Sequence, residues 1–573
     1  MWLCALGGLR GEKLLDSETA FQLYLSGTMI SVPMTKRLVL LVLFGGVLLQ
    51  AQPAGLPDPV RKAAERITAE RLARDLEYLS SDELKGRNTP SPGFDRAAGY
   101  IVGRLGNAGL EPAGDNGTFL QHYTMRESEV DTAAASIAID GRRFRFGDDF
   151  VMRAFAGPVS GRRAVVYVGH GWTVPGRSID PFAGVDVKGK IVVAHGPRAL
   201  PKGVDIPLIG RVNVGASTVF AEAERRGAAA VLVIAPASAL TSWAQARTQN
   251  TIVRELHPIV PSAYAAVPIT AVMVAPQVTE ALMAGERVGG AALAAQAEAQ
   301  DYPASFQLTK SITIDIPAGA TTDHQPYNVV AVLRGSDPIL SREYIVIESH
   351  LDGAVGTVAV NGDDIYNSAD DNASGSAGTL AIAEALAAGP RPRRSVIFLW
   401  DSGEERGLWG TRFFVSRPPV ALDQIVAEFN VDMIGANRAP GSPDADAAGT
   451  TGPNEVYLIG PGVLSAGTDA RLEAVNRGYL NLRFNREHDR GESEFFYPRS
   501  DAGPFLERGI LTIGFTTGMH ARYHGPADEA RFLDPGKMEA IARTIYALAW
   551  TLADAPERPR IDRPIPPTVP KYK

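Results

Sequence analysis

Groups that can ionise follow four apolar runs in the C-terminal half of the sequence, where predicted strands end. The four groups are Glu348-Ser349-His350-Leu351-Asp352, Asp401-Ser402-Gly403-Glu404-Glu405, Asp432, and His520 with Tyr523 and His524. In open α/β sheets the functional crevice lies outside the carboxyl ends of the parallel strands. We therefore expect these imidazoles and carboxylates to lie together at one edge of a sheet.

Imidazoles and carboxylates without sulfur are ligands that suit zinc and, less exclusively, cobalt or manganese. Two such ions ~3.5–4 Å apart can hold the attacking and departing oxygens of a hydrolysis. One carboxylate must then bridge the ions, and an unbound carboxylate must take a proton from the attacking water. The neighbours Glu404 and Glu405 can supply that base and one ligand. A single acidic pair is more often an exposed helix start, favoured by the helix dipole, but four such clusters argue against that interpretation.

The loop from Asn367 to Gly375 follows the strand that ends at His350. By itself it is typical of a turn followed by a helix start, with Asp and Asn residues as caps. Its position favours a metal-binding loop and adds Asp371 to the candidates. The candidate metal ligands are His350, Asp371, Glu405, Asp432 and His524.

Strand and helix patterns alternate from Tyr327 onward and must position these groups. Apolar runs predict strands at Val329–Leu333, Tyr344–Ile347, Ser395–Trp400, Ile425–Val431 and Ile510–Phe515. Helix patterns lie at Ser376–Ala388, Thr468–Leu480 and Met538–Leu552. This alternation predicts an α/β fold, with a mostly parallel twisted sheet and helices on both faces.

The N-terminal half has a different pattern. An amphipathic helix is expected at Ala63–Leu79 and a second from Asp95 to about Ala108, whereas short β-rich runs follow, with a helix at Ser217–Arg226. The β-rich part predicts a separate mixed insert. The expected division is an upstream extension and signal peptide (1–55), an N-terminal part of the catalytic domain (56–135), the insert (136–310), the catalytic domain (311–556) and a proline-rich tail (557–573), either a peripheral strap or a disordered end.

Length and composition set broad limits on the function. A chain of 573 residues favours at least two folded units. Its content of 45% hydrophobic and 21% charged residues is typical of a soluble globular protein. The net charge of -7 argues against a general nucleic-acid binder, which would carry a basic stripe. The oligomeric state cannot be read from these features.

The N-terminal region resembles a secretory signal. Lys36 and Arg37 precede the apolar run from Leu38 to Leu49, and small residues follow at Ala51 and Ala54. This pattern predicts export, to the periplasm or the medium, by a signal peptide, with a membrane anchor or buried helix as the alternative. The run is short for a membrane span, so we expect none in the mature chain. If Met34 is the true start, Cys4 is also lost, and no thiol remains for disulfides or metal binding.

Five motifs in this order resemble the cocatalytic two-zinc aminopeptidases, relatives of bacterial leucyl aminopeptidase, transferrin receptor and glutamate carboxypeptidase. The motifs are Ser349-His350-Leu351-Asp352, Ala369-Asp370-Asp371-Asn372-Ala373-Ser374-Gly375, Gly403-Glu404-Glu405-Arg406-Gly407-Leu408-Trp409-Gly410, Asn430-Val431-Asp432-Met433-Ile434-Gly435 and Tyr523-His524-Gly525-Pro526-Ala527-Asp528. The resemblance covers the C-terminal half. It implies the zinc-peptidase fold, two Zn²⁺ (with Co²⁺ or Mn²⁺ as substitutes) and peptide substrates.

The resemblance assigns the five ligands position by position. His350 and Asp432 would hold one zinc, Glu405 and His524 the other, and Asp371 would bridge the two.

The same resemblance implies three further roles. Glu404 would be the general base, and the Asp352 carboxylate would fix the tautomer of His350. Tyr523 matches a position that donates a hydrogen bond to the tetrahedral oxyanion in some relatives.

Two N-terminal segments also resemble parts of this family. The segment Leu79 to Arg87 is similar to the N-terminal piece of secreted members. The insert resembles a protease-associated domain at Asp186-Val187-Lys188-Gly189-Lys190-Ile191-Val192-Val193 and at Ala223-Glu224-Arg225-Arg226-Gly227-Ala228-Ala229-Ala230. In relatives such inserts typically lie over the mouth of the active site and restrict access.

The sequence departs from the family pattern before its last strand. Family members often carry Ser-Asp-His there, whereas Ser500-Asp501 is followed by Ala502. His488, beside Asp489, could supply the missing contact, although a surface histidine is the plainer interpretation. His520 could either line the pocket or cap a loop.

Three functions remain in view. The first is an exported aminopeptidase, and the second is a carboxypeptidase or other amidohydrolase, including single-zinc glutaminyl cyclases, on the same fold. A carboxypeptidase needs a basic pocket, which Arg406, Arg499 or Arg522 could provide. The third is a non-catalytic binding protein, but such relatives lose ligands and the base, whereas this chain keeps all six residues.

Overall fold

The computed structural model describes residues 56–569, except 155–156, 197–198, 205–215, 237–242, 244–246, 248–253, 260–268, 355 and 357–358. The predicted signal peptide, with Lys36, Arg37 and the run to Ala54, lies outside the described residues, as do Met34 and Cys4. Within the described ranges, no helix combines the length and the apolar character that crossing a membrane requires.

One large sheet organises the C-terminal half. Among the described residues, its strands lie in the order β1-β14-β16-β15-β17-β20-β18-β19, and β2 also pairs with β14. The central strands β16, β15, β17 and β20 are parallel, whereas β14 and β18 run antiparallel to their neighbours β16 and β20. The mostly parallel sheet predicted from the sequence is thereby confirmed. The strands are β1 (Glu111–Pro112), β2 (Leu120–His122), β14 (Tyr327–Leu333), β15 (Tyr344–His350), β16 (Ser395–Asp401), β17 (Ile425–Val431), β18 (Glu455–Ile459), β19 (Arg483–Asn485) and β20 (Leu511–Thr516).

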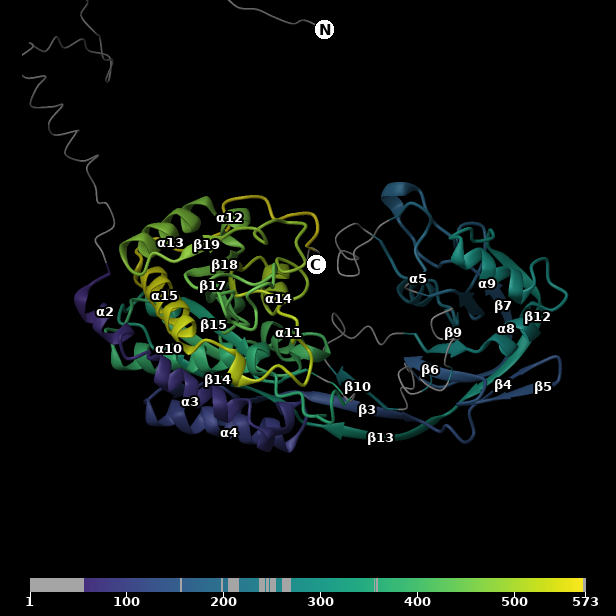
Figure 1. The fold of residues 1–573 in the computed structure, drawn as a ribbon, viewed down its shortest axis with the longest axis horizontal. Coiled ribbons are helices and arrows are strands. Elements are labelled where there is room, and N and C mark those ends of the chain that lie inside the picture. Colours follow the sequence, from purple (N-terminus) through teal and green to yellow (C-terminus); the bar gives the residue numbers. More distant parts are fainter. Residues whose placement is uncertain are drawn as a thin grey trace, which may run out of the picture. The chain divides into compact units, whose positions relative to one another are not determined.

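Helices cover both faces of this sheet (Figure 1). Alternate residues of β14 belong to opposite cores, with Val329 in one and Val330 in the other, because successive strand side chains point to opposite faces. The first core holds the helices α2 (Asp58–Ala64), α3 (Ala69–Leu79), α4 (Pro92–Asn107), α10 (Gly375–Ala388), α13 (Ala466–Gly478) and α15 (Pro535–Asp554). The second holds α11 (Trp409–Ser416) and α14 (Ala502–Glu507).

The single helix predicted at Ala63–Leu79 is wrong, because the chain forms two helices there. The first, α2, ends at Ala64, and α3 begins at Ala69. Thr68 lies between them in an extended conformation, and its side chain accepts a hydrogen bond from the N–H of Arg71. An N-cap residue of this kind starts a new helix rather than continuing the old one.

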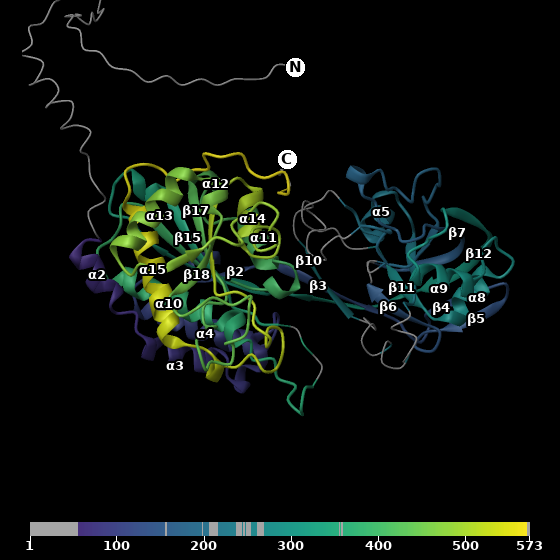
Figure 2. The ribbon, with the colours of Figure 1, turned by 45° about the horizontal axis from the view of Figure 1, so that its top comes forward.

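The insert contains a second sheet, in the order β5-β4-β12-β7-β8-β9-β11-β6 among the described residues. Helix α5 (Val219–Arg225) packs on one face, while α8 (Pro276–Met283) and α9 (Gly290–Glu298) pack on the other (Figure 2). Its strands are β4 (Ser136–Ile139), β5 (Arg142–Arg145), β6 (Phe150–Ala154), β7 (Val159–Tyr167), β8 (Ile191–Ala194), β9 (Ala230–Ile234), β11 (Ala271–Val274) and β12 (Phe306–Ile316). Strand β12 therefore crosses the boundary expected at residue 310.

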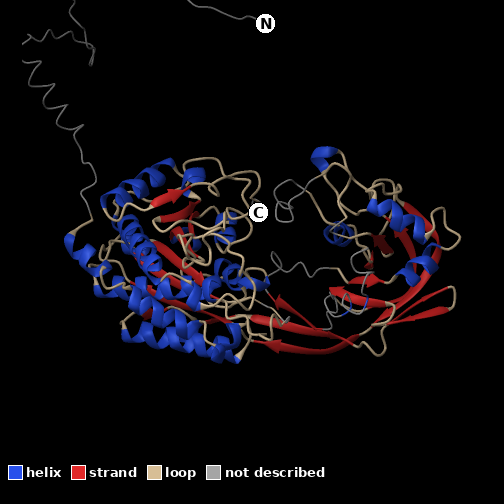
Figure 3. Ribbon diagram, viewed as in Figure 1, coloured by secondary structure: helices blue, strands red, loops and turns tan. Residues whose placement is uncertain are grey.

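A three-stranded ribbon joins the insert to the rest of the chain (Figure 3). It consists of β3 (Thr124–Val130), β10 (Arg254–Ile259) and β13 (Ala318–His324), and both outer strands pair antiparallel with β3. Where the ribbon begins, Tyr123 and Met125 form an apolar cluster with Trp409 and Phe413 of α11.

The described part of the proline-rich tail follows the surface as a strap. The carboxylate of Asp562 accepts hydrogen bonds from the N–H groups of Ala466 and Gly467 at the start of α13. Val569 is buried in an apolar cluster that also contains Ile561 and Ile565. The tail thus adds contacts to the C-terminal domain up to residue 569.

Arg87 links the N-terminal segment to the loops on either side of the predicted metal site. Its guanidinium is fully buried and donates to the carbonyl oxygens of Leu351, Asn367 and Ser368 at 2.9 Å each, and also to that of Leu79. Burial lowers the pKa of Arg87 to about 10, so the side chain stays charged at neutral pH. Segment 79–87 is therefore part of the framework of the site.

We predict that Arg87→Lys lowers the free energy of unfolding by about 3 kcal/mol. The single ammonium nitrogen of lysine has three N–H donors and cannot replace the hydrogen bonds of the guanidinium to four carbonyl oxygens. Urea denaturation followed by tryptophan fluorescence measures this change. Arg74→Lys is the matched control, since Arg74 is 63% exposed and lies 3.6 Å from Glu70. That variant should stay within about 0.5 kcal/mol of the original protein. Equal stabilities for the two variants would contradict the role of Arg87.

Candidate metal centre

Four parallel strands bring the predicted ligands to one edge of the large sheet. His350 ends β15, Glu405 follows β16, Asp432 follows β17, and His524 lies in the loop after β20. Asp371 comes from the turn Ala369–Ser374, which leads into α10. The structure thus brings together all five residues that the sequence singles out.

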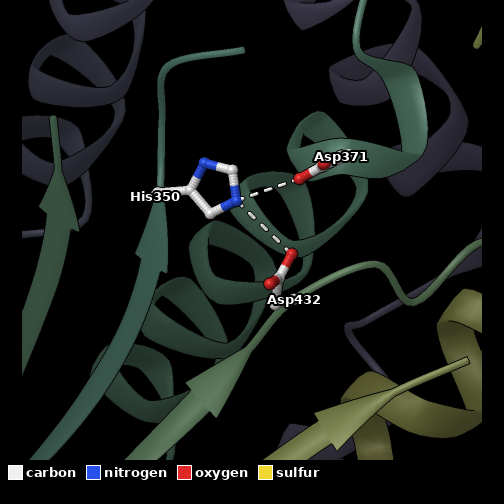
Figure 4. Close-up of side chains that lie close together, drawn as sticks. All are labelled: His350, Asp371 and Asp432. Atoms are coloured by element: carbon white, nitrogen blue, oxygen red, sulfur yellow. Dashed lines mark ion pairs between the residues drawn. The ribbon is translucent and has the colours of Figure 1, made fainter. Parts of the chain in front are cut away.

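The first group contains His350, Asp371 and Asp432 (Figure 4). The Nε2 atom of His350 lies 3.1 Å from Oδ1 of Asp371 and 3.4 Å from Oδ1 of Asp432. All three side chains point toward one another from separate elements, and the His350 side chain is 1% exposed.

The second group contains Asp371, Glu405 and His524. The Nε2 atom of His524 lies 3.0 Å from Oδ2 of Asp371 and 3.1 Å from Oε2 of Glu405. Asp371 therefore turns one carboxylate oxygen toward each histidine. This is the arrangement that a bridging carboxylate requires.

The residues fit a pair of metal ions. In each group the three candidate ligand atoms lie within 4.8 Å of one another. Nε2 of His350, Oε1 of Glu405 and Oδ1 of Asp432 are buried and have no hydrogen-bond partner within the described part of the chain. Unpaired buried polar atoms are costly, and coordination to a cation would satisfy them. Nitrogen and oxygen donors in this mixture suit zinc.

A network of buried acids orients the Asp371 loop. The carboxylate of Asp528 accepts hydrogen bonds from the N–H of Asp370 at 3.0 Å and from that of Asp371 at 3.1 Å. Asp370 in turn accepts from the N–H of Gly435 at 2.7 Å. His520 is buried with its Nε2 atom 3.3 Å from Asp370, so it pairs with an acid behind the site and does not line the pocket. The motif containing Asp528 is visible in the sequence, but its partner on a distant loop is not.

The acids of the site share a strongly negative, buried environment. Burial raises the pKa of Asp352 to about 6 and that of Glu405 to about 7. Burial alone would also raise the pKa of Asp371, but the close imidazoles of His350 and His524 lower it below the ordinary range. A bound cation would be the largest local charge and would stabilise the ionised forms of these acids.

Glu404 belongs to neither ligand group but lies next to both. Its side chain lines the same pocket as Asp371 and Asp432, and burial raises its pKa well above the ordinary value. Its N–H donates to Oδ1 of Asp352 at 3.2 Å, which holds the turn after β16. A carboxyl group that is close to the metal ligands but not among them can accept a proton.

Asp352 contacts His350 mainly through its main chain. The Nδ1 atom of His350 lies 3.1 Å from the carbonyl oxygen of Asp352, whereas the carboxylate is 3.8 Å away. The carbonyl is therefore the acceptor that fixes the tautomer, with Nδ1 protonated and Nε2 facing the metal site. This differs from the sequence prediction, which gave the role to the carboxylate. The carboxylate instead anchors the turn at Glu404.

Tyr523 lies at the wall of the pocket, with its ring stacked on that of His524 at 3.7 Å between centroids. Nη2 of Arg499 donates to the phenol oxygen at 2.8 Å. The hydroxyl hydrogen of Tyr523 therefore remains free to donate to another group.

The pocket beside the metal site has a volume of about 640 Å³, including the space at its mouth. Ser500 and Ala502 line it, whereas Asp501 between them is buried. His488 lies between the rings of Tyr457 and Phe495, with centroids 4.5 and 4.4 Å away, so it is neither a free surface residue nor a part of the lining.

Of the three arginines considered for a basic pocket, Arg499 lines the pocket in the described structure. Arg522 forms an ion pair with Asp444 at 2.7 Å. The guanidinium of Arg406 lies over the ring of Trp409, 5.8 Å from its centroid.

Residues 328–549 match the model of peptidase family M28. This segment belongs to that family. The chain is similar to leupeptin-inactivating enzyme 1 of Streptomyces exfoliatus, with 31% identity over 230 residues, 38% of this chain and 43% of that protein. It also resembles a probable leucine aminopeptidase of Arthroderma otae, with 27% identity over 230 residues, 39% of this chain and 58% of that protein. The chain thus spans about half the length of the curated relatives it matches.

A solved structure shows a similar fold over most of the chain. The aminopeptidase from Aneurinibacillus sp. strain AM-1 is 18% identical and has a TM-score of 0.52, covering 88% of this chain and 98% of that one. The similarity in fold to this aminopeptidase thus extends beyond residues 328–549.

We predict that Asp528→Asn weakens zinc binding by the M28 domain about 10–100-fold, because the Asp371 loop loses the charge that holds its N–H groups. Competition with a chromophoric zinc chelator measures the change. Glu529→Gln is the control, because Glu529 is the next residue in the chain and its carboxylate pairs with Arg531 rather than with the Asp371 loop. Wild-type zinc affinity in Asp528→Asn would show that the loop is held by other contacts.

Proposed function

We propose that this protein is a two-zinc aminopeptidase that releases N-terminal residues from peptides. The observation that carries the proposal is the position of Asp371, whose two oxygens face two separate groups of ligands. The M28 match and the names of the relatives support peptide hydrolysis. A non-catalytic binding role is disfavoured because the ligands and the candidate base are all present in one place.

The ligand groups indicate which residues would hold each ion. His350 and Asp432 would hold one zinc, Glu405 and His524 the other, and Asp371 would contact both. Two zinc ions bound there would polarise the scissile carbonyl and make a water easier to deprotonate.

Glu404 is the group that moves the proton. It would take a proton from the attacking water and deliver it to the departing amine, and both steps need a carboxyl that reaches the same pocket as the ligands. Its raised pKa suits this task, because a base whose pKa lies nearer neutrality can both accept and release a proton.

Tyr523 and Arg499 would stabilise the negative oxygen that develops during the attack. Arg499 holds the phenol oxygen, so the hydroxyl hydrogen is free to point into the pocket. A donor held in place before the reaction gains most when charge develops beside it.

The pocket also suggests how the substrate is recognised. The carboxylates of Glu404 and Asp432 favour a positively charged α-amine near the metal site. Apolar side chains, including Ile459, Phe515 and Met519, line the pocket beside them. These features fit a peptide with a free amino end and an apolar first residue.

A carboxypeptidase is the second candidate, and Arg499 is the observation that favours it. Its guanidinium faces the pocket and could pair with a terminal carboxylate. However, it already donates to Tyr523 and lies 3.5 Å from Glu494, so part of its capacity is used.

The N-terminal sequence supports two further parts of the proposal. We infer that the protein is exported by the signal peptide at residues 36–54. We also infer that the insert is a protease-associated domain. The two segments that resemble such domains, 186–193 and 223–230, lead into the neighbouring strands β8 and β9, and the second begins in α5.

We predict that Glu404→Gln lowers kcat by about 10²–10⁴-fold while two zinc ions per chain are retained, because the amide cannot accept the proton. Peptidase assays together with elemental analysis measure both quantities. Glu77→Gln, on the exposed side of α3, is the control and should be fully active. Near-normal turnover by Glu404→Gln would exclude Glu404 as the base.

The two candidate functions differ in the chain end that they need. An aminopeptidase should cleave a peptide with a free amine and a C-terminal amide, but fail when the amine is acetylated. We expect at least about a hundredfold preference for the free amine, because the buried carboxylates would otherwise face a neutral group. Mass spectrometry of the products decides the matter. Cleavage that survives acetylation and requires a free carboxylate would favour the carboxypeptidase.

A further inference from the structure

Four buried carboxyl groups form a second acidic cluster within the large sheet, separate from the two ligand groups. They belong to Glu348 in β15, Asp401 in β16, Glu428 in β17 and Asp501 just before α14, and each is at most 1% exposed. One oxygen each from Glu348, Asp401 and Asp501 lie within 4.8 Å of one another.

Only two of the eight oxygens have a hydrogen-bond donor in the described part of the chain. Nδ2 of Asn430 donates to Glu348 at 2.9 Å, and the hydroxyl of Thr411 donates to Asp501. The six oxygens without a partner are Oε1 of Glu348, both of Asp401, both of Glu428 and Oδ2 of Asp501. Buried polar atoms are nearly always paired, so this number in one place needs an explanation.

Glu428 is an independent indication of a ligand at this place. It is not one of the three residues whose oxygens form the compact group, yet its carboxyl contacts that of Glu348. It is fully buried, and neither of its oxygens meets a donor. Two carboxylates can contact each other in this way only if a proton or a cation lies between them.

Protons alone are an expensive way to neutralise the cluster. Burial, with the charges of the other acids, raises the pKa of Glu428 and Asp501 well above their ordinary values. For a carboxyl with an ordinary pKa of about 4, staying neutral at pH 7 lowers the folding equilibrium by about 10³-fold. The cost recurs for each further group, whereas one divalent cation offsets two negative charges at once.

We propose that Glu348, Asp401, Glu428 and Asp501 bind a third metal ion, a Ca²⁺-like divalent cation, between β15, β16, β17 and the start of α14. The donors are all oxygens, as hard cations prefer, and offer neither the nitrogen nor the sulfur that zinc favours. Ca²⁺ accepts six to eight oxygens in irregular geometry at about 2.3–2.6 Å, whereas Mg²⁺ demands a near-regular octahedron and usually keeps several waters. Four carboxylates in a buried site fit the former.

This ion would act as a brace for the strands that carry the zinc ligands. Glu348 lies two residues before His350 on β15, and Glu428 lies four residues before Asp432 on β17. Asp401 ends β16, four residues before Glu405. An ion bound to all three strands would hold their carboxyl ends at fixed spacing. It would take no part in the reaction, because none of the four side chains lines the pocket.

Metal counting tests the proposal. The full chain is saturated with Zn²⁺ and Ca²⁺, passed into metal-free buffer and analysed by plasma mass spectrometry. We expect two zinc and one calcium per chain for the wild type. Glu348→Gln/Glu428→Gln should keep two zinc but lose the calcium. Asp315→Asn, an exposed acid on β12, is the control for a simple change of charge and should keep three ions.

Two results would overturn the third site. One is a wild-type protein without calcium at saturating Ca²⁺, which would mean that the acids share protons. The other is calcium that persists in the double variant, which would place it elsewhere. If that variant does not fold, thermal melting of the zinc-loaded wild type with and without Ca²⁺ decides, because an unchanged Tm excludes the site and a raised Tm supports it. No substrate is involved, so failure of the proposed peptidase function leaves this test intact.

Discussion

The shared carboxylate of Asp371 is the constraint on which the rest of the site depends. Its two oxygens reach His350 at the end of β15 and His524 in the loop after β20, so this strand end and this loop must both be held relative to one short turn. Asp528 accepts hydrogen bonds from N–H groups of that turn, and Arg87 donates to the two carbonyls just before it, those of Asn367 and Ser368. Through Arg87, the N-terminal segment thus helps to fix the position of the Asp371 side chain in the M28 domain.

Much of the fold and the ligand set could be predicted from the sequence because each predicted strand is short, apolar and followed by a polar group. Ile425–Val431 agrees fully with β17, and the other four predicted strands lie within three residues of the observed ends. Parallel strands carry their ends to one edge, so order along the chain was enough to bring His350 and Asp432 together. Motif resemblance then supplied the roles that spacing alone left open.

What escaped prediction depends on contacts between distant parts of the chain or on single atoms. Arg87 and Asp528 look like ordinary charged residues until their partners are known. The sequence places Glu348 among the strand-end groups of the predicted metal site, yet it is buried in the sheet with Glu428 and Asp501. The choice between the carbonyl and the carboxylate of Asp352 rests on less than one ångström. Sequence patterns report burial and periodicity, but they do not report which buried groups meet.

The ribbon that joins the insert has a consequence for how this architecture can be altered. Strands β3 and β13 are antiparallel neighbours, with Val130 opposite Ala318, so the insert leaves and re-enters the chain at one point. The entropic cost of closing a loop grows only slowly with its length, so a long insert between two paired strands costs little more than a short one. Replacing everything beyond that residue pair by a tight turn would leave every strand pairing of the large sheet in place, and different inserts could be exchanged there without redesign of the catalytic framework.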